Sequence, residues 1–269
     1  MLPNGTILES LIRIGISVGL FTLLVILEHY RPKRIHTQKK LKRWGINIGL
    51  GLFNNLLLRI TLGSLAIQSA LIAQEKHWGL LNQFFNTDHW GLMLAGYLLL
   101  DFAIYLQHIA SHKWQWLWRF HCVHHSDLEI DASTAVRFHP GEIIISMIYK
   151  SLCIVLIGPS AMTVFIFEIT LNGCALFNHS NIAIPGRIES RLRRVLITPD
   201  LHRIHHSLRR IETDSNYGFS ICCWDKLCRT YTTTTATRPL AQLPLGLPDF
   251  RTPKKLGWVH LLALPFRRQ

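Results

Sequence analysis

The chain has 269 residues and a net charge of +13 at pH 7, with 49% hydrophobic residues, 17% charged residues and a mean hydropathy of +0.21. This composition is unusual for a soluble domain of this length. A basic chain can bind nucleic acid, but here the Lys and Arg residues lie beside apolar segments and form no basic module interleaved with aromatic residues, which argues against that class.

Long apolar segments predict an all-α integral membrane protein with about four to five membrane helices. A helix that crosses a bilayer needs about 20 apolar residues. Three segments come close to that length: 7–27, 46–73 and 90–107. Two shorter segments, 143–157 and 161–177, meet at Gly158-Pro159 and predict a helical hairpin that either spans the bilayer or only dips into it.

The amino-terminal stretch MLPNGTILES has no Lys or Arg, and no small-residue cleavage site follows the first apolar segment, so we expect a retained helix rather than a signal peptide. Seven Lys and Arg residues lie in 31–43, and seven more lie between Arg187 and Arg210. The positive-inside rule therefore places both clusters in the cytoplasm, together with residues 108–140. The expected location is a bacterial cell membrane or the endoplasmic reticulum.

The carboxyl-terminal residues show weaker patterns. Residues 231–255 are rich in Thr, Pro and Leu and predict irregular surface chain, while 256–264 (LGWVHLLAL) predict a short interfacial or surface helix. The six cysteines form no C-x-x-C pair, so neither a disulfide framework nor a zinc finger is expected. We expect a single domain over residues 1–269.

The histidines carry the functional signal. The pattern His-x-x-His-His occurs twice, as HCVHH at 121–125 and as HRIHH at 202–206, and each copy places three imidazoles on one helix face. A set of ten candidate metal ligands results: His108, His112, His121, His124, His125, His139, His179, His202, His205 and His206. The other five histidines are scattered singly and are expected to be ordinary surface or interfacial residues: His29, His36, His77, His89 and His260.

Neighbouring residues suggest how the ligands are positioned. Thr198-Pro199 predicts a helix start just before His202, with Thr as the N-cap and Pro at the first helical position. We expect Asp200 to act as a second-shell acceptor or a helix-dipole partner. Asp101 and Tyr105 precede His108 at helical spacing and are expected to orient it, although ordinary interfacial packing also explains Tyr105.

Ten imidazoles exceed the needs of one ion, and two ions with four or five ligands each account for the number. Iron, zinc, copper and nickel all accept imidazole, so the ligand type leaves the metal open. The sequence lacks the Glu-x-x-His motif of soluble di-iron bundles, which excludes that class. The HPGE sequence at 139–142 is close to the haem loop of cytochrome b5, but it leads directly into an apolar helix, so haem is not expected.

The order of motifs, H-x3-H, H-x2-H-H, R-x-H-P, N-H-S and H-x2-H-H, resembles the fatty acid hydroxylase/sterol desaturase superfamily of integral-membrane di-metal enzymes. Further positions are similar to the family pattern: Glu28, Pro32, Arg43-Trp44, Asn47, Asn216-Tyr217-Gly218 and Trp224-Asp225. The resemblance covers residues 28–230.

The resemblance implies a non-haem di-iron oxidoreductase that uses O₂ to attack a C–H bond of a fatty acyl chain, sterol or related lipid, with hydroxylation favoured over desaturation. It implies two Fe ions on the ten histidines, with zinc possible in preparations, and a lipid that enters from the bilayer. It also implies a separate electron donor, because the chain has no fused haem domain. The alternative is a non-catalytic or zinc-loaded membrane metal binder or a transporter. A transporter is expected to carry ionisable residues at mid-membrane depth, whereas these histidines cluster beyond the span ends.

Overall fold

The structure is a computed structural model that describes residues 7–83, 89–235, 239–252 and 256–267. The predictions for residues 1–6, 236–238 and 253–255 concern residues outside these ranges. Within them the regular structure is helical, with three isolated β-bridges and no strand. The predicted all-α class is confirmed.

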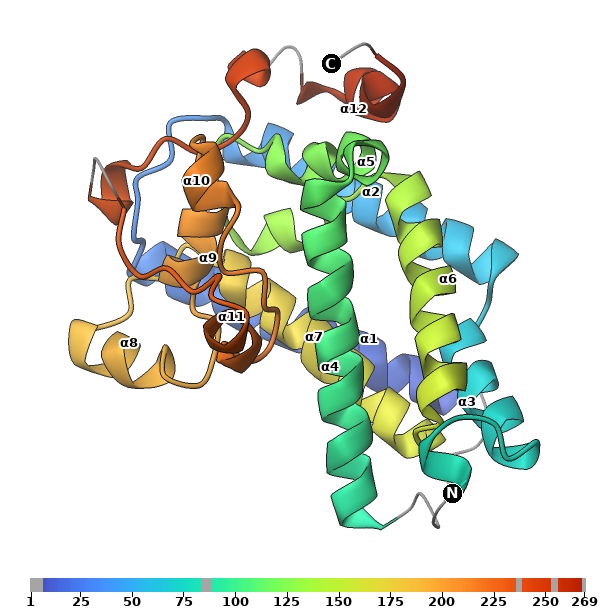
Figure 1. The fold of residues 1–269 in the computed structure, drawn as a ribbon. Coiled ribbons are helices and arrows are strands. Elements are labelled where there is room, and N and C mark those ends of the chain that lie inside the picture. The colour runs from blue at the N-terminus through green and yellow to red at the C-terminus, as the bar shows by residue number, and fades with distance from the viewer. Residues whose placement is uncertain (1–6, 84–88, 236–238, 253–255, 268–269) are drawn as a thin grey trace.

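Among the residues that the structure describes, five helical stretches are long and apolar enough to cross a membrane, which confirms the expected four to five. They are α1 (Ile7–Tyr30), the consecutive pair α2 (Lys40–Thr61) and α3 (Leu65–Glu75), α4 (Trp90–Lys113), α6 (Pro140–Ile157) and α7 (Ala161–His179). Figure 1 shows α1 beside α7, while α4 and α6 run together through the middle of the molecule.

The segment predicted as one span over 46–73 is interrupted near its middle. Gly63 adopts a left-handed conformation with φ of 54°, a backbone geometry that commonly ends a helix, and α3 begins two residues later. The predicted span therefore becomes two helices that differ in direction, and α3 packs against α6 and α7.

Helices α6 and α7 are joined at Gly158, which ends α6 in a left-handed conformation with φ of 71°. Ser160 caps α7 by accepting a hydrogen bond from the Thr163 amide. The two helices diverge from this turn, and both pack against α3 and α4 around a core that includes Ile154 and Phe167 (Figure 1).

Short helices gather at the opposite end of the spans, where the histidines lie, and we call this region the histidine end. They are α5 (Gln115–His125), η2 (Ala132–Val136), α8 (Gly186–Leu192), α9 (Pro199–His205), α10 (Arg210–Thr213) and α11 (Cys223–Leu227), while η1 (Leu81–Gln83) lies elsewhere. Residues that follow α1 join this region, because Lys33 pairs with Asp200 at 2.7 Å and Pro32 forms a bridge with Ile182.

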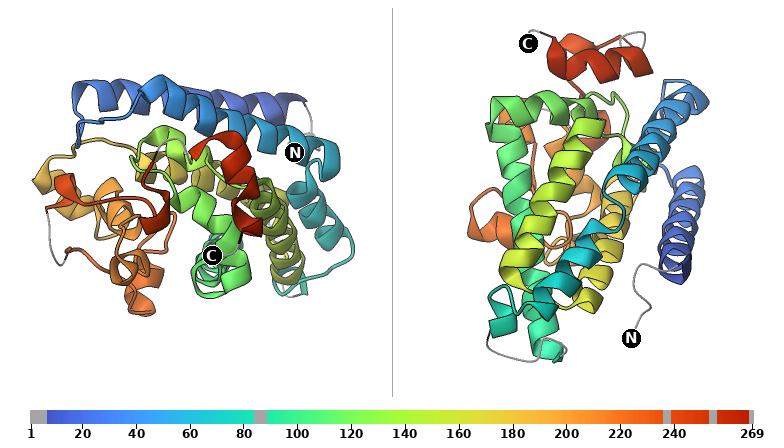
Figure 2. Two further views of the ribbon diagram at one scale, coloured as in Figure 1. Left: turned by 90° about the horizontal axis from the view of Figure 1, so that it is seen from above. Right: turned by 90° about the vertical axis from the view of Figure 1, so that its right-hand side faces the viewer.

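The tail covers the histidine end more closely than irregular surface chain would. It contains η3 (Leu240–Gln242), η4 (Pro248–Phe250), α12 (Trp258–Ala263) and η6 (Leu264–Phe266). Leu243 is fully buried, and Leu261 and Leu264 belong to one hydrophobic cluster with Leu50 of α2 and Val123 of α5. Figure 2 shows the end of the tail lying over this part of the molecule. The helix expected over 256–264 is present as α12, whereas Leu243 and Leu245, within the expected irregular stretch 231–255, are buried rather than at the surface.

Candidate metal centre

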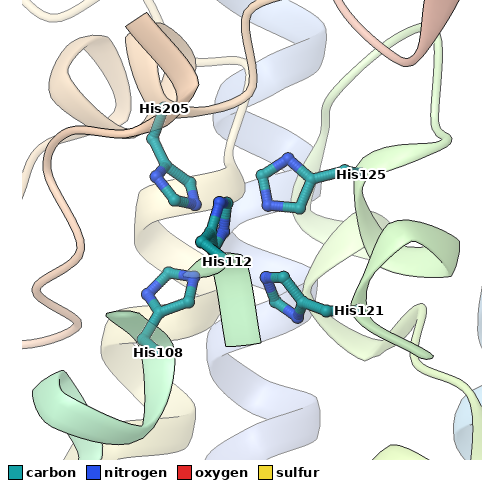
Figure 3. A group of neighbouring side chains, drawn as sticks. All are labelled: His108, His112, His121, His125 and His205. Carbon is teal, nitrogen blue, oxygen red and sulfur yellow. The ribbon is translucent and has the colours of Figure 1, made fainter. Parts of the chain in front are cut away.

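Five of the predicted ligands converge at the histidine end (Figure 3), and we call them group one. Helix α4 supplies His108 and His112, α5 supplies His121 and His125, and α9 supplies His205. All five are buried, and one ligand atom from each lies within 4.8 Å of the others. Opposite ligands of one ion are about 4.2 Å apart at the usual metal–nitrogen distance of about 2.1 Å, so this spacing suits a single ion.

Four more predicted ligands form group two: His124 from α5, His179 at the end of α7, His202 from α9 and His206 just after α9. They are also buried, and their ligand atoms also lie within 4.8 Å of one another. Each His-x-x-His-His triple serves both groups. In the first triple the i and i+4 residues belong to group one, and in the second triple they belong to group two.

Backbone carbonyls fix the tautomers of several rings. His108 Nδ1 lies 2.7 Å from the Tyr217 carbonyl, and His205 Nδ1 lies 2.7 Å from the Ser215 carbonyl. Since a carbonyl only accepts, each Nδ1 donates its proton and the neutral ring keeps a bare Nε2 lone pair. Those two Nε2 atoms are buried without a hydrogen-bond partner, as expected of metal ligands.

Group two gives the strongest indication that the residues fit a metal. Nδ1 of His124 and Nδ1 of His179 face the carbonyls of Arg137 and Ala175, so both Nε2 atoms are bare in the neutral rings. These Nε2 atoms are nevertheless 3.0 Å apart, and His202 Nε2 is also 3.0 Å from that of His179. Facing lone pairs repel unless a cation lies between them. Two ligands at right angles around one ion are separated by about 3.0 Å at normal bond lengths.

Burial keeps these imidazoles in the form that binds metal. Loss of hydration lowers the pKa of His124, His125, His202 and His206 well below the ordinary histidine value, and neighbouring imidazoles lower it further. Burial lowers the pKa of His205 to about 3. The rings are therefore neutral at physiological pH, so a metal does not have to displace protons from them.

Sequence reasoning did not identify the acid that positions His121. Glu142 Oε1 accepts a hydrogen bond from His121 Nδ1 at 2.6 Å, which leaves His121 Nε2 free to bind a metal. A carboxylate behind a ligating histidine orients the ring and raises its basicity. Glu142 lies in the first turn of α6. The sequence does place this acid at the start of an apolar helix, three residues after His139, and that position could have indicated a partner for a metal ligand.

His139 does not join either group. It caps α6, because its Nδ1 accepts a hydrogen bond from the Gly141 amide at 3.0 Å, and its Nε2 lies 3.2 Å from the Leu262 carbonyl. Both ring nitrogens are therefore engaged, and the ring packs against Phe120. His139 is therefore not a member of either ligand group.

The three side chains expected to support the ligands make other contacts. Asp101 accepts a hydrogen bond from the Trp224 indole at 2.8 Å, and the Tyr105 hydroxyl lies 2.9 Å from the Thr230 hydroxyl. Asp200 pairs with Lys33 and lies in the first turn of α9, the position expected of a helix-dipole partner. The expected N-cap Thr198 is confirmed, with Pro199 at the first position of α9. Helical spacing placed Asp101 and Tyr105 on the helix that carries His108. It could not predict their partners Trp224 and Thr230, because these come from a distant part of the chain.

Several of the outlying family positions hold the backbone that carries the ligands. Asp225 accepts hydrogen bonds from the amides of Tyr217 and Gly218 at 2.8 and 2.9 Å, and so fixes the loop whose carbonyl contacts His108. Glu28 accepts hydrogen bonds from the amides of Ala132 and Asn181, which links the end of α1 to both flanks of group two.

A buried ionic network lies behind group two. Arg43 contacts Asp127 at 3.0 Å and Asp131 at 2.7 Å, and Asn47 accepts a hydrogen bond from Arg137 at 2.8 Å. Although burial acts in the opposite direction, the Arg43 guanidinium holds the pKa of Asp127 below its usual value. This network fixes the segment in which the Arg137 carbonyl accepts a hydrogen bond from His124 Nδ1.

A cavity of about 350 Å³ extends from group one into the spans. His108 and His121 line one end, and no member of group two lines it. A molecule in this cavity therefore approaches the ligands of group one.

Comparisons with known proteins add independent information. A family model for fatty acid hydroxylase matches residues 93–230, more than half of the chain, and this range includes both groups. The ornithine lipid hydroxylase OlsE of Rhizobium tropici is 29% identical over 189 residues, which cover 69% of this chain and 54% of that protein. The alkylglycerol monooxygenases of Homo sapiens and Danio rerio are 30% and 32% identical over 51% and 53% of this chain and 30% of each relative. This chain thus spans about half or less of these relatives, and no solved structure matches it.

Proposed function

Because the chain belongs to the fatty acid hydroxylase family, we propose that it is an oxygen-dependent lipid hydroxylase with two iron ions. One observation carries the proposal: nine buried histidines are sorted into two ligand groups, and one group borders a cavity within the membrane-spanning helices. Hydroxylation is favoured over desaturation, since the relatives are named hydroxylase and monooxygenase.

The proposed ligands of the two ions are group one and group two. Iron supplies redox chemistry that activates oxygen and oxidises a C–H bond, which zinc cannot do. The same imidazoles also bind zinc, so a zinc-loaded chain would keep its ligands and lack turnover.

The chain's own residues position the reaction. Carbonyls of Tyr217 and Ser215 and the Glu142 carboxylate each hold one ring of group one so that its Nε2 faces inward. Burial of the rings keeps bulk water from the ligand atoms, which strengthens their electrostatic interactions. The cavity then brings part of a lipid from the bilayer to His108 and His121.

We also propose that the histidine end faces the cytoplasm, where a separate electron donor reaches it. The basic residues of 31–43 lie at this end, as the positive-inside rule requires. The test uses cysteines placed at the exposed positions Lys39 and Arg187. They should resist a membrane-impermeant thiol reagent in intact cells and react after lysis. Labelling of either cysteine in intact cells would contradict the proposed orientation and place the histidine end outside the cytoplasm.

The function is tested with the purified full chain in lipid nanodiscs. Iron reconstitution, a chemical reductant and isotopically labelled O₂ should give a lipid product that contains one labelled oxygen atom, detected by mass spectrometry. The zinc-loaded protein is the matched control and should give none. Metal flux through the protein in sealed vesicles, without a labelled product, would support the transporter alternative instead.

A further inference from the structure

The cavity next to group one ends in a cluster of charged residues. Arg13 from α1, Lys150 from α6 and Glu168 from α7 line the end away from the histidines. The volume of about 350 Å³ equals that of roughly a dozen liquid waters. The cavity therefore holds a fragment of about a dozen non-hydrogen atoms rather than a whole lipid.

Most of the cavity lining is apolar, but it also carries polar groups that a cavity for hydrocarbon alone would not need. Six uncharged polar residues contribute to it: Asn54, Asn55, Gln107, Ser111, Ser146 and Asn172. The Asn54 side-chain oxygen is buried without a hydrogen-bond partner. Because unsatisfied polar groups are costly at membrane depth, this lining indicates that a polar group enters.

The charged cluster has hydrogen-bond donors to spare. The Glu168 carboxylate lies between Lys150 and Arg13, with Arg13 Nη1 at 3.0 Å, and Arg13 Nε also contacts Glu9 at 2.8 Å. Arg13 Nη2 is buried without a hydrogen-bond partner, and a lysine ammonium carries three donors. With Glu9 the cluster holds two cations and two acids, and the donors that these acids leave unused, on Arg13 Nη2 and on Lys150, complement a group that brings acceptor oxygens.

We propose that Arg13 and Lys150 bind an anionic oxygen group, a carboxylate or a phosphate, on the lipid that is hydroxylated. Glu168 holds both cations in place and is a positioning residue. This assignment rests on the proposed function and adds the class of substrate: a lipid whose anionic group enters the cavity beside the reaction site.

The opening of the cavity suits entry from the bilayer. Asn55 on α2 and Asn172 on α7 both line the cavity and are exposed, so the cavity reaches the surface of the spans near these two residues. Their amide groups offer hydrogen bonds to a polar group as it passes, while the rest of the lipid remains in the membrane.

The helix α6 sets a length scale for the position of oxidation. Lys150 follows Glu142 by eight residues, which is about 12 Å along a helix, and Glu142 contacts His121. An extended chain advances about 1.2 Å per bond, so this span corresponds to about ten bonds. The oxidised carbon should therefore lie within about ten bonds of the anionic group.

The same cluster connects α1 to α6 and α7, so its loss also affects folding, and binding has to be separated from stability. The full chain, loaded with zinc in nanodiscs, is tested with three radiolabelled probes of equal chain length: N-palmitoylglycine, its methyl ester and hexadecyl phosphate. The wild type should bind an anionic probe at least about tenfold more tightly than the ester, because the ester cannot make the charge-assisted contact. Lys150→Met and Arg13→Gln should lose this preference, while the control Lys76→Met, at an exposed position, should keep it.

Tighter binding of one or both anionic probes supports the assignment and identifies the preferred anion. Equal binding of acid, phosphate and ester by the wild type overturns it. A uniform loss for all three probes in Lys150→Met and Arg13→Gln also overturns it, because the residues would then serve folding alone. Zinc-loaded protein requires no turnover, so an absent oxygenated product refutes the hydroxylase without affecting this result. Oxidation more than about 15 bonds from the anionic group contradicts the length scale.

Discussion

Group one and group two are built from the same residue type but differ in number and surroundings. Group one has five histidines, borders the cavity and is supported by the Glu142 carboxylate and by the loop that Asp225 fixes. Group two has four histidines, does not line the cavity and rests on the network around Arg43. The comparison suggests that group one meets the substrate while group two completes the pair of ions.

The two groups are in direct contact. His125 of group one stacks on His206 of group two with ring centroids 4.3 Å apart, and the two residues come from different triples. In each triple, the two adjacent histidines belong to different groups: His124 and His125 in the first triple, and His205 and His206 in the second. The two groups are therefore held side by side. The repeated motif therefore provides the bridge between two unlike sites rather than two copies of one site.

The largest effect is expected when two ligands are removed from one group. His108→Ala with His112→Ala should leave three ligands in group one, and His179→Ala with His202→Ala should leave two in group two. Each pair should lower bound metal from two ions to one and reduce product by more than the 10–100-fold typical of outer-shell changes. Elemental analysis and product assays measure both. His29→Ala with His260→Ala is the control. An equal loss of metal in this control would contradict the assignment of the clustered histidines as the ligands.

Single substitutions should separate the groups by ligand number. His205→Ala leaves four ligands in group one, enough to keep an ion, whereas His179→Ala leaves three in group two. We expect the first variant to hold about two metal ions and the second about one. Four histidines still complete the usual coordination of an ion, whereas three do not. The reverse order, measured by elemental analysis after dialysis, would show that ligand number does not govern retention.

Glu142→Gln should weaken group one alone. The neutral amide accepts the His121 proton less strongly, and loss of such a support typically lowers metal affinity about 10–100-fold. Stepwise zinc titration with a competing chelator measures the two affinities. Glu75→Gln, which changes an exposed acid, is the matched control. A shift in both affinities would indicate that the two groups do not act separately.

The smallest effect is expected for Asp214→Asn. Asp214 Oδ1 lies 3.7 Å from His112 Nδ1, too far for a hydrogen bond, and it also pairs with Lys113 at 2.8 Å. Zinc affinity of group one should therefore fall by less than about tenfold, below the range for close outer-shell partners. A loss as large as that of Glu142→Gln in the same titration would mean that the Asp214 contact tightens when metal binds.

The sequence predicted the membrane helices better than their packing. Apolar length was sufficient to find all five spans, since the bilayer imposes that length on any crossing helix. The break at Gly63 and the packing of the tail depend on contacts between distant segments, and composition carried little information about them. Glu168 illustrates the limit: an acid inside an apolar helix needs a partner, but its partners Arg13 and Lys150 come from other helices, and only the packing of these helices brings them together.

For the metal centre, the sequence by itself determined which residues offer imidazoles and which helix faces carry them, because helical spacing places i, i+3 and i+4 together. It also determined the start of α9 through Thr198 and Pro199. Only the tertiary structure divided nine histidines into groups of five and four and directed both nitrogens of His139 to other partners. The physical reason is that spacing along a chain sets directions within one helix, whereas the rings that meet are decided by how α4, α5, α7 and α9 cross.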